Sequence, residues 1–150
     1  MVAAALFVVA LLVLVGLGYL VLPGTPPPAP VTVTSVRFTI VQGTNASGLG
    51  WFGPSAFNYS GAANGYPFTV AAGGTFTISV TLWNHDNQAH TIYSAESGAP
   101  FRVSSTAPSL PVGVAAMEDD ALIQIGLVAP STPGASLVLM VTIDTTPPPG

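Results

Sequence analysis

Four segments of the chain carry an apolar side chain at every second position, and this alternation restricts the possible folds more than any other feature of the sequence. A period of two places the apolar side chains of a segment on one face, as in a strand with one buried face. The four alternating sets are Val36, Phe38 and Ile40; Phe76, Ile78, Val80 and Leu82; Ile123, Ile125 and Leu127; and Leu137, Leu139, Val141 and Ile143.

Shorter strand candidates and turn signals lie between the alternating segments. The strand candidates span residues 68–71, 90–94 and 101–104, and the turn signals lie at residues 73–74, 84–88, 97–98 and 130–134. No helical periodicity follows Leu22. Residues 31–144 are therefore predicted to form an all-β antiparallel sandwich of immunoglobulin-like or Greek-key type.

The segment before the sandwich is apolar from Val2 to Leu22. As a helix it would span about 30 Å, the thickness of a bilayer core, and Pro23 and Gly24 would end it. A secretory signal peptide fits poorly, because it needs a positive n-region and a small-residue cleavage site. We expect an N-terminal hydrophobic α-helix over residues 1–22, buried in a membrane or against other helices. Its expected packing residues are Leu6, Phe7, Leu11, Leu14, Gly16, Gly18 and Tyr19.

The helix lacks the positive flank that normally orients a membrane segment, since no Lys or Arg precedes Arg37. One explanation is that a basic leader is removed before Met1. This arrangement resembles type IV pilins, whose leader ends in a basic residue and glycine, and whose exposed helix then moves from the membrane into a filament core. Bacterial pilins usually carry a glutamate at the position of Ala5, and archaeal pilins commonly lack it. The alternative is a single-span membrane anchor with Met1 as its initiator.

Two proline-rich stretches flank the predicted sandwich. Residues 23–30, which end in GTPPPAP, are predicted to form a semi-rigid polyproline hinge. Residues 145–150, TTPPPG, are interpreted as an extended tail outside the core.

The segment of residues 43–65 is predicted to be a long, strand-poor loop. Its aromatic residues are interpreted either as a contact surface for other subunits or a ligand, or as a cover for an open end of the sandwich. These residues are Trp51, Phe52, Phe57 and Tyr59. Asn45 and Asn58 each begin a glycosylation sequon, so a glycan is a possible partner.

Charged side chains are scarce, at 5% of residues with a net charge of −4, against about 25% in an ordinary soluble domain. Nucleic-acid binding needs clustered Lys and Arg, and only Arg37 and Arg102 are present. The absence of cysteine excludes disulfides and thiolate metal sites. Such a polar, weakly charged surface suits an extracellular or cell-surface protein.

The richest polar cluster is WNHDNQAHT, residues 83–91. Its N-x-D-x-x-x-H-T pattern resembles the strand–turn–strand that supplies the first copper-binding histidine of cupredoxins, here His90. Blue-copper sites also need a thiolate and a later histidine. The chain has no Cys and no His after His90. The resemblance therefore implies a related sandwich fold and argues against type-1 or dinuclear copper.

The remaining signals for site chemistry are slight. His85, Asp86 and His90 are candidates for holding a metal through nitrogen and oxygen ligands. Turns also favour Asn and Asp for their bonds to backbone amides, so no metal or other cofactor is predicted. The acidic residues 118–120 are interpreted as a solvated turn, with calcium binding as the alternative. No nucleophile motif, phosphate loop or paired-carboxylate signature is present, and no enzymatic activity is expected.

These observations favour a structural subunit of an extracellular, pilus-like filament, with the helix in the core and the sandwich outside. Its partners would be copies of itself, and the cytoplasmic membrane before assembly, with no nucleic acid. The alternative is a single-span membrane protein whose cell-surface sandwich serves as an accessory subunit or binding module. A basic leader upstream of Met1 would favour the pilin.

Overall fold

The computed structural model describes residues 26–43, 48–51, 58–59 and 67–150. The predicted helix of residues 1–22, with its packing residues, lies outside them, as do Asn45, Phe52 and Phe57. Within the described ranges, no helix has the length and apolar character needed to cross a membrane.

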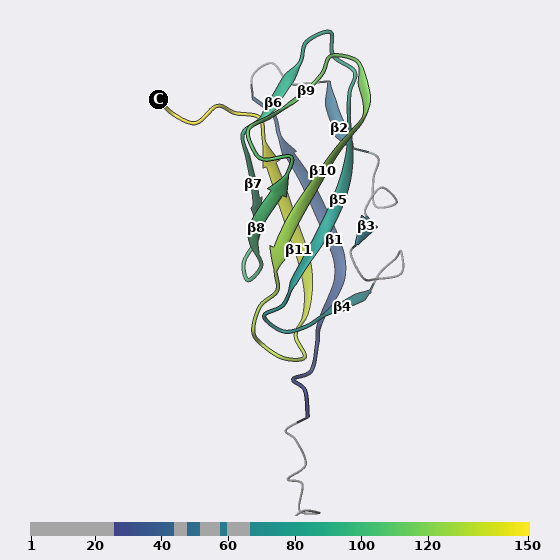
Figure 1. The fold of residues 1–150 in the computed structure, drawn as a ribbon, viewed down its shortest axis with the longest axis vertical. Helices are drawn as coiled ribbons and strands as arrows, with labels where there is room; N and C mark the ends of the chain where they lie inside the picture. The colour runs from purple at the N-terminus through teal and green to yellow at the C-terminus, as the bar shows by residue number, and fades with distance from the viewer. Residues whose placement is uncertain (1–25, 44–47, 52–57, 60–66) are drawn as a thin grey trace, which may run out of the picture.

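The described residues form two β-sheets packed face to face as a sandwich, with a small third sheet at one end (Figure 1). The first sheet, called here the β1–β11 sheet, has the order β4 (Phe68–Val70), β1 (Val31–Val41), β11 (Ser136–Asp144), β7 (Ser94–Ser97). The second, the β5–β10 sheet, has the order β2 (Leu49–Trp51), β5 (Thr75–Asn84), β10 (Glu118–Val128), β8 (Arg102–Ala107), and β3 (Asn58–Tyr59) also pairs with β5. The third consists of β6 (His90–Ile92) and β9 (Val112–Val114).

The core lies between the two large sheets and contains the alternating apolar side chains. The predicted rows of β5 and β10 are buried along their whole length. In the rows of β1 and β11, Ile40 and Leu137 are only half-buried, and they pack against the core. Phe76 makes edge-to-face ring contacts with Phe68 and Phe101, at centroid distances of 5.9 and 6.2 Å. The faces predicted from the period of two are thus confirmed, and the described part of the chain is an all-β sandwich.

The prediction of a wholly antiparallel sandwich is wrong at one pair of strands. β1 and β11 run parallel, with Val33 opposite Leu137 and Val41 opposite Asp144. Parallel strands cannot be joined by a hairpin and need a long connection. Here the connection is the rest of the sandwich, because β1 is its first strand and β11 its last.

Three strands lie where none was expected. β2 and β3 fall inside the predicted loop of residues 43–65, and both pair with the same edge of β5. β9 follows Pro108 and Pro111 and pairs with β6. The predicted acidic turn of residues 118–120 is also wrong, because these residues begin β10.

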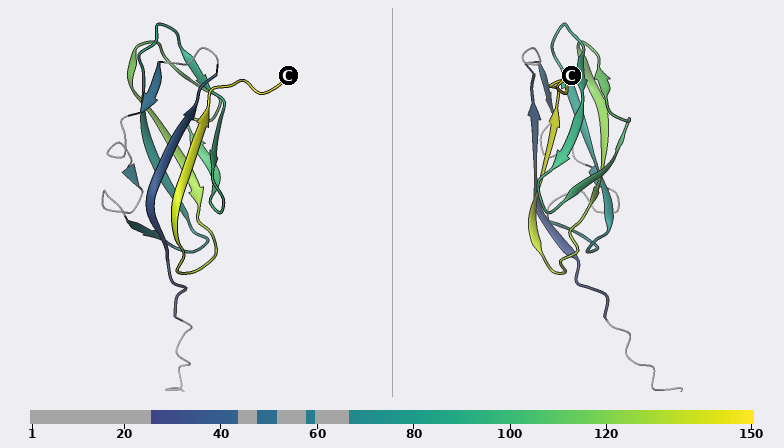
Figure 2. Two further views of the ribbon diagram at one scale, coloured as in Figure 1. Left: turned by 180° about the vertical axis from the view of Figure 1, so that it is seen from behind. Right: turned by 90° about the vertical axis from the view of Figure 1, so that its left-hand side faces the viewer.

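The sandwich has two distinct ends (Figures 1 and 2). The linker, residues 26–30 of the proline-rich hinge, enters β1 at one end, called here the proximal end. β1 and β11 both run from there to the opposite, distal end, where the C-terminal tail leaves. Near the proximal end the β10–β11 loop is bonded to the linker and to the start of β1. Gly134 N–H donates to Ala29 O at 3.2 Å, and Thr32 N–H of β1 donates to Ala135 O at 2.7 Å.

Candidate functional site: the polar distal end

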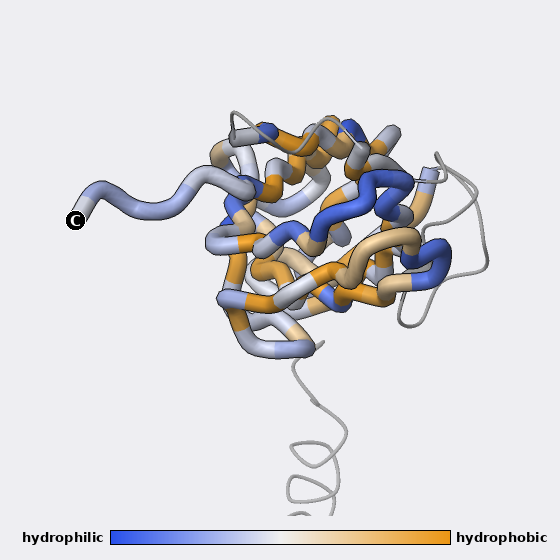
Figure 3. The backbone as a smooth tube through the Cα atoms, turned by 90° about the horizontal axis from the view of Figure 1, so that it is seen from above, coloured by the Kyte–Doolittle hydropathy of each residue, from blue (hydrophilic) through white to orange (hydrophobic). Residues whose placement is uncertain are grey.

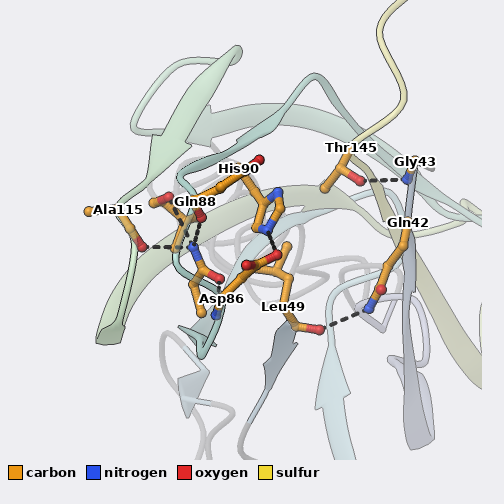
Figure 4. Close-up of polar contacts among 10 residues, drawn as sticks. Gln42, Gly43, Leu49, Asp86, Gln88, His90, Ala115 and Thr145 are labelled. Atoms are coloured by element: carbon orange, nitrogen blue, oxygen red, sulfur yellow. Dashed lines mark hydrogen bonds and ion pairs between the residues drawn. The ribbon is translucent and has the colours of Figure 1, made fainter. Parts of the chain in front are cut away.

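The distal end is organised around Asn84, the last residue of β5, whose side chain is fully buried. Asn84 follows Leu82 in the inward row of β5, so the strand itself points the amide into the molecule. Its Nδ2 donates to the carbonyls of Gln88 and Ala115, each at 2.8 Å, and its Oδ1 accepts the backbone N–H of Asp86 at 3.0 Å. The amide therefore ties the β5–β6 turn to the β9–β10 turn, and Figure 4 labels the residues of its two carbonyl partners, Gln88 and Ala115.

His90, at the start of β6, faces the same turn and is only 8% exposed. Its Nε2 lies 3.1 Å from Oδ2 of Asp86, and Figure 4 shows the ring directed at that carboxylate. The contact is a hydrogen bond, and it becomes an ion pair when the imidazole is protonated. Asp86 is thus held at its backbone by Asn84 and at its side chain by His90.

His85 takes a different direction, toward the outer face of the β5–β10 sheet. Its Nε2 lies 2.9 Å from Oδ1 of Asp119, and both side chains are exposed. The ring also stacks on Trp83, with 4.3 Å between centroids and an interplanar angle of 26°. Trp83 precedes His85 by two positions, which places both on one face of an extended chain.

The three candidate metal ligands do not converge. Asp86 and His90 face each other, whereas His85 faces Asp119. In the described part of the chain, no group of three or more His, Cys, Asp or Glu side chains is placed to hold a metal ion. Neither histidine ring is hydrogen-bonded there to a Ser or Thr hydroxyl that it could activate. The arrangement closes the end of the fold through hydrogen bonds.

The acidic run at the start of β10 takes part in the same closure. Glu118 Oε2 accepts the backbone N–H of Ala115 at 2.6 Å, and Asp119 contacts His85. Met117, just before the strand, has a positive φ of 56° and donates its N–H to Asp86 O at 3.1 Å. Two of the three carboxylates thus have protein partners, and these partners lie on different elements.

A second set of polar contacts, around Thr145, closes the distal end of the β1–β11 sheet. Thr145 follows Ile143 in the inward row of β11 and is buried. Its Oγ1 donates to Val41 O at 3.1 Å and accepts the N–H of Gly43 at 2.9 Å (Figure 4). Thr145, assigned to the tail from the sequence, is therefore packed against the end of β1, and residues 146–150 are exposed.

A groove of about 380 Å³ lies between β1 and β2, close to the polar contacts of Asn84 and Thr145. Its lining residues are Phe38, Thr39, Ile40, Gln42, Leu49, Gly50, Trp51 and Trp83. Gln42 Nε2 donates to Leu49 O at 2.9 Å, and Trp51 makes an edge-to-face contact with Phe38 at 5.5 Å. The expected contact residue Trp51 thus belongs to a strand and is half-buried, and Tyr59 lies in β3, opposite Ile78.

Sequence reasoning placed the histidines in a polar cluster but did not single out Asn84 or Thr145. The sequence does contain a signal that both side chains point inward. Each lies two positions after the last apolar residue of an inward row, Leu82 for Asn84 and Ile143 for Thr145. Figure 3, which looks onto the distal end, shows strongly hydrophilic stretches of chain there.

By fold and site, the described residues form a two-sheet, all-β sandwich whose distal end is closed by buried polar side chains. No family model, curated protein or solved structure matches the chain.

Proposed function

We propose that the chain is a structural subunit of an extracellular, pilus-like filament. Residues 1–22 form the filament core as a hydrophobic helix, and the sandwich forms the outer surface. The observation that carries this proposal is the character of the two outer sheet faces. Both expose large apolar side chains among Thr and Ser, namely Val138 and Met140 on β11 and Leu122 on β10. Faces of this kind lose little hydration when copies pack side by side.

The position of the linker also supports a helix in the filament core and a sandwich on its surface. The linker enters at the proximal end, where Ala29 O accepts the N–H of Gly134 in the β10–β11 loop, and the first residues of β1 are bonded to the same loop through Thr32. Its prolines favour an extended, semi-rigid chain. A short stiff spacer holds the sandwich at a set distance from the helix, as an ordered outer layer requires.

The proposal extends to details of the fold and the surface. The immunoglobulin-like or Greek-key description is supported by the chain path, which changes sheet between β7 and β8 and again between β10 and β11. Asn45 and Asn58 are proposed glycan attachment sites. The partners are copies of the same chain, with the cytoplasmic membrane holding the helix before assembly.

The alternative function is a membrane-anchored sandwich that acts as an accessory subunit or binding module at the cell surface. The groove between β1 and β2 favours it, because two tryptophans and the Gln42 amide line that groove. Aromatic rings with a few polar groups are common in ligand sites.

Electron microscopy of the full-length protein, in material sheared from the cell surface, tests the choice. We expect ordered fibres that contain the chain. Recovery of single copies or small complexes from membrane fractions alone would overturn the filament and favour the anchored sandwich.

A further inference from the structure

The outer face of the β1–β11 sheet combines an exposed apolar row with charges of opposite sign on either side. Val138 and Met140 stand on β11, 41% and 52% exposed. Arg37 lies on β1, directly beside Met140, and Glu96 lies on β7, beside Thr142. The remaining outward positions of these strands are mainly Thr and Ser.

Arg37 and Glu96 are not paired with each other. They are two strand spacings apart across the sheet, about 10 Å, and two residues apart along the strands, about 7 Å. Both side chains are exposed, and neither takes part in an ion pair with any described residue. The face therefore presents an unpaired positive charge and an unpaired negative charge across an apolar row.

We infer that this face binds the same face of a second copy of the chain, with the two sandwiches parallel. A two-fold axis lying along β11, midway between the facing sheets, sets β1 of each copy opposite β7 of the other. Arg37 of one copy and Glu96 of the other then face each other across the contact, offset by two residues, about 7 Å, along the strands. The axis also sets Val138 and Met140 against their own counterparts. Such self-complementarity is what a two-fold interface between identical subunits requires.

The parallel arrangement agrees with the position of the linkers. An axis along the strands sends both linkers out at the same end, as two subunits anchored in one membrane or one filament core must be. An axis across the strands would set Arg37 against Arg37 and send the linkers in opposite directions. The inference rests in this respect on the proposed function, which anchors every copy through residues 1–22.

Asp144, the third charged residue on the face, does not oppose the arrangement. It lies at the distal end of β11, about 13 Å beyond Met140 at the usual strand rise. Its Oδ1 accepts the N–H of Thr146 at 2.7 Å. Facing sheets cross at about 30°, so the two distal ends diverge and the two Asp144 carboxylates separate.

The size of the face indicates a contact that forms only between anchored copies. β1, β11, β7 and β4 contain 11, 9, 4 and 3 residues, and these strands cover about 430 Å². A stable interface buries about 800 Å² on each partner. Anchoring raises the effective concentration of neighbouring heads and makes up the difference.

The outer face of the β5–β10 sheet is the natural comparison. It exposes Leu122 to the same extent as Met140, 52%. Its charges lie at opposite ends of the strands, with Arg102 at the proximal end of β8 and Asp119 at the distal end of β10. They would match only in an antiparallel pair, whose linkers leave at opposite ends.

Crosslinking through single introduced cysteines tests the inference, because the native chain contains no cysteine. Packed sheets lie about 10 Å apart, beyond the reach of a disulfide, so the probe is a short bis-maleimide. The full-length Met140→Cys and Leu122→Cys variants are treated in membranes and in filament preparations. We expect at least about fivefold more crosslinked dimer from Met140→Cys, as expected of tethered neighbours with a preferred face.

A charge exchange supplies the second measurement. Arg37→Glu in the Met140→Cys background should lower crosslinking about fivefold, because two opposite-charge pairs become like-charge pairs. Adding Glu96→Arg should restore it. Equal crosslinking by the two cysteine variants, or no restoration by the double exchange, overturns the inference. If crosslinking is restored in membranes but no fibre forms, the contact between the faces is supported and the filament proposal fails. If fibres form but crosslink only through Leu122→Cys, the filament proposal is supported and the contact is overturned.

Discussion

Asn84 and Thr145 occupy equivalent places, each one step beyond the last apolar residue of an inward row. An apolar side chain there would leave backbone groups of the neighbouring turns without partners at the end of the core. The amide of Asn84 satisfies two carbonyls and one N–H, and the hydroxyl of Thr145 satisfies one of each. Buried polar groups of this kind are stabilising only while every partner is present.

Replacing Asn84 with Ala should lower the free energy of unfolding by about 2–3 kcal/mol, because the carbonyls of Gln88 and Ala115 lose their donor. The measurement is urea denaturation followed by tryptophan fluorescence. Asn87→Ala is the matched control, since Asn87 lies exposed in the same turn and should change stability by less than about 0.5 kcal/mol. Equal effects of the two substitutions would contradict the role assigned to Asn84.

At the scale of single elements, the close approach of β2 to β5 depends on Gly50. A Cβ at this position would overlap the ring of Trp83. Trp83 in turn stacks on His85, so displacement of its ring would disturb both the strand pairing and the outer contact with Asp119.

Gly50→Ala should therefore lower the free energy of unfolding by about 1–3 kcal/mol, as overpacking does in a well-packed site. Gly113→Ala offers a matched comparison in β9, because a Cβ at Gly113 meets no atom within 4 Å. Its effect should be neutral or slightly stabilising, since alanine restricts the unfolded chain. The measurement is the thermal unfolding of both variants. An unchanged stability of the Gly50→Ala protein would show that the ring of Trp83 can move without loss of stability.

The long strands could be predicted from the sequence because each is long enough to show several repeats of the period of two. β2, β3 and β9 were missed, because a strand of two or three residues contains no repeat. β4 and β6 are equally short, but they fall in the strand candidates of residues 68–71 and 90–94, which lie beside turn signals. The parallel pairing of β1 with β11 was also out of reach, because it joins segments about a hundred residues apart and leaves no local pattern.

Only part of the candidate site could be predicted from the sequence. The sequence placed His85, Asp86 and His90 in one polar cluster, but it did not indicate that the histidines face different partners. The direction of His85 continues the outward row of Trp83, whereas that of His90 depends on the path of the turn before it. The position of Asn84, by contrast, follows directly from the alternation that ends at Leu82.

At the scale of the whole molecule, the sandwich should fold without the segment that precedes it. Its core is formed by its own strands, from β1 to β11. We predict that a chain lacking residues 1–30 is soluble, folded and monomeric, and no longer assembles. In water each large apolar side chain of the deleted segment would cost about 1.5–3 kcal/mol to leave exposed, so that segment should supply most of the assembly energy.

Analytical ultracentrifugation and circular dichroism of the shortened chain test this prediction. A folded monomer is the expected result. Polymerisation of the shortened chain would place the assembly energy in the sandwich instead, and an unfolded chain would show that the sandwich needs the deleted segment.

The parallel pairing of β1 and β11 also has a mechanical consequence. A pulling force applied between the linker and the C-terminal tail enters β1 at the proximal end and leaves β11 at the distal end. The hydrogen bonds between the two strands are then loaded in shear, all at once, whereas an antiparallel hairpin pulled at its open end would unzip one bond at a time. In single-molecule stretching, rupture from these two ends should therefore need a higher force than rupture between the linker and the β7–β8 loop, and equal forces would contradict this account.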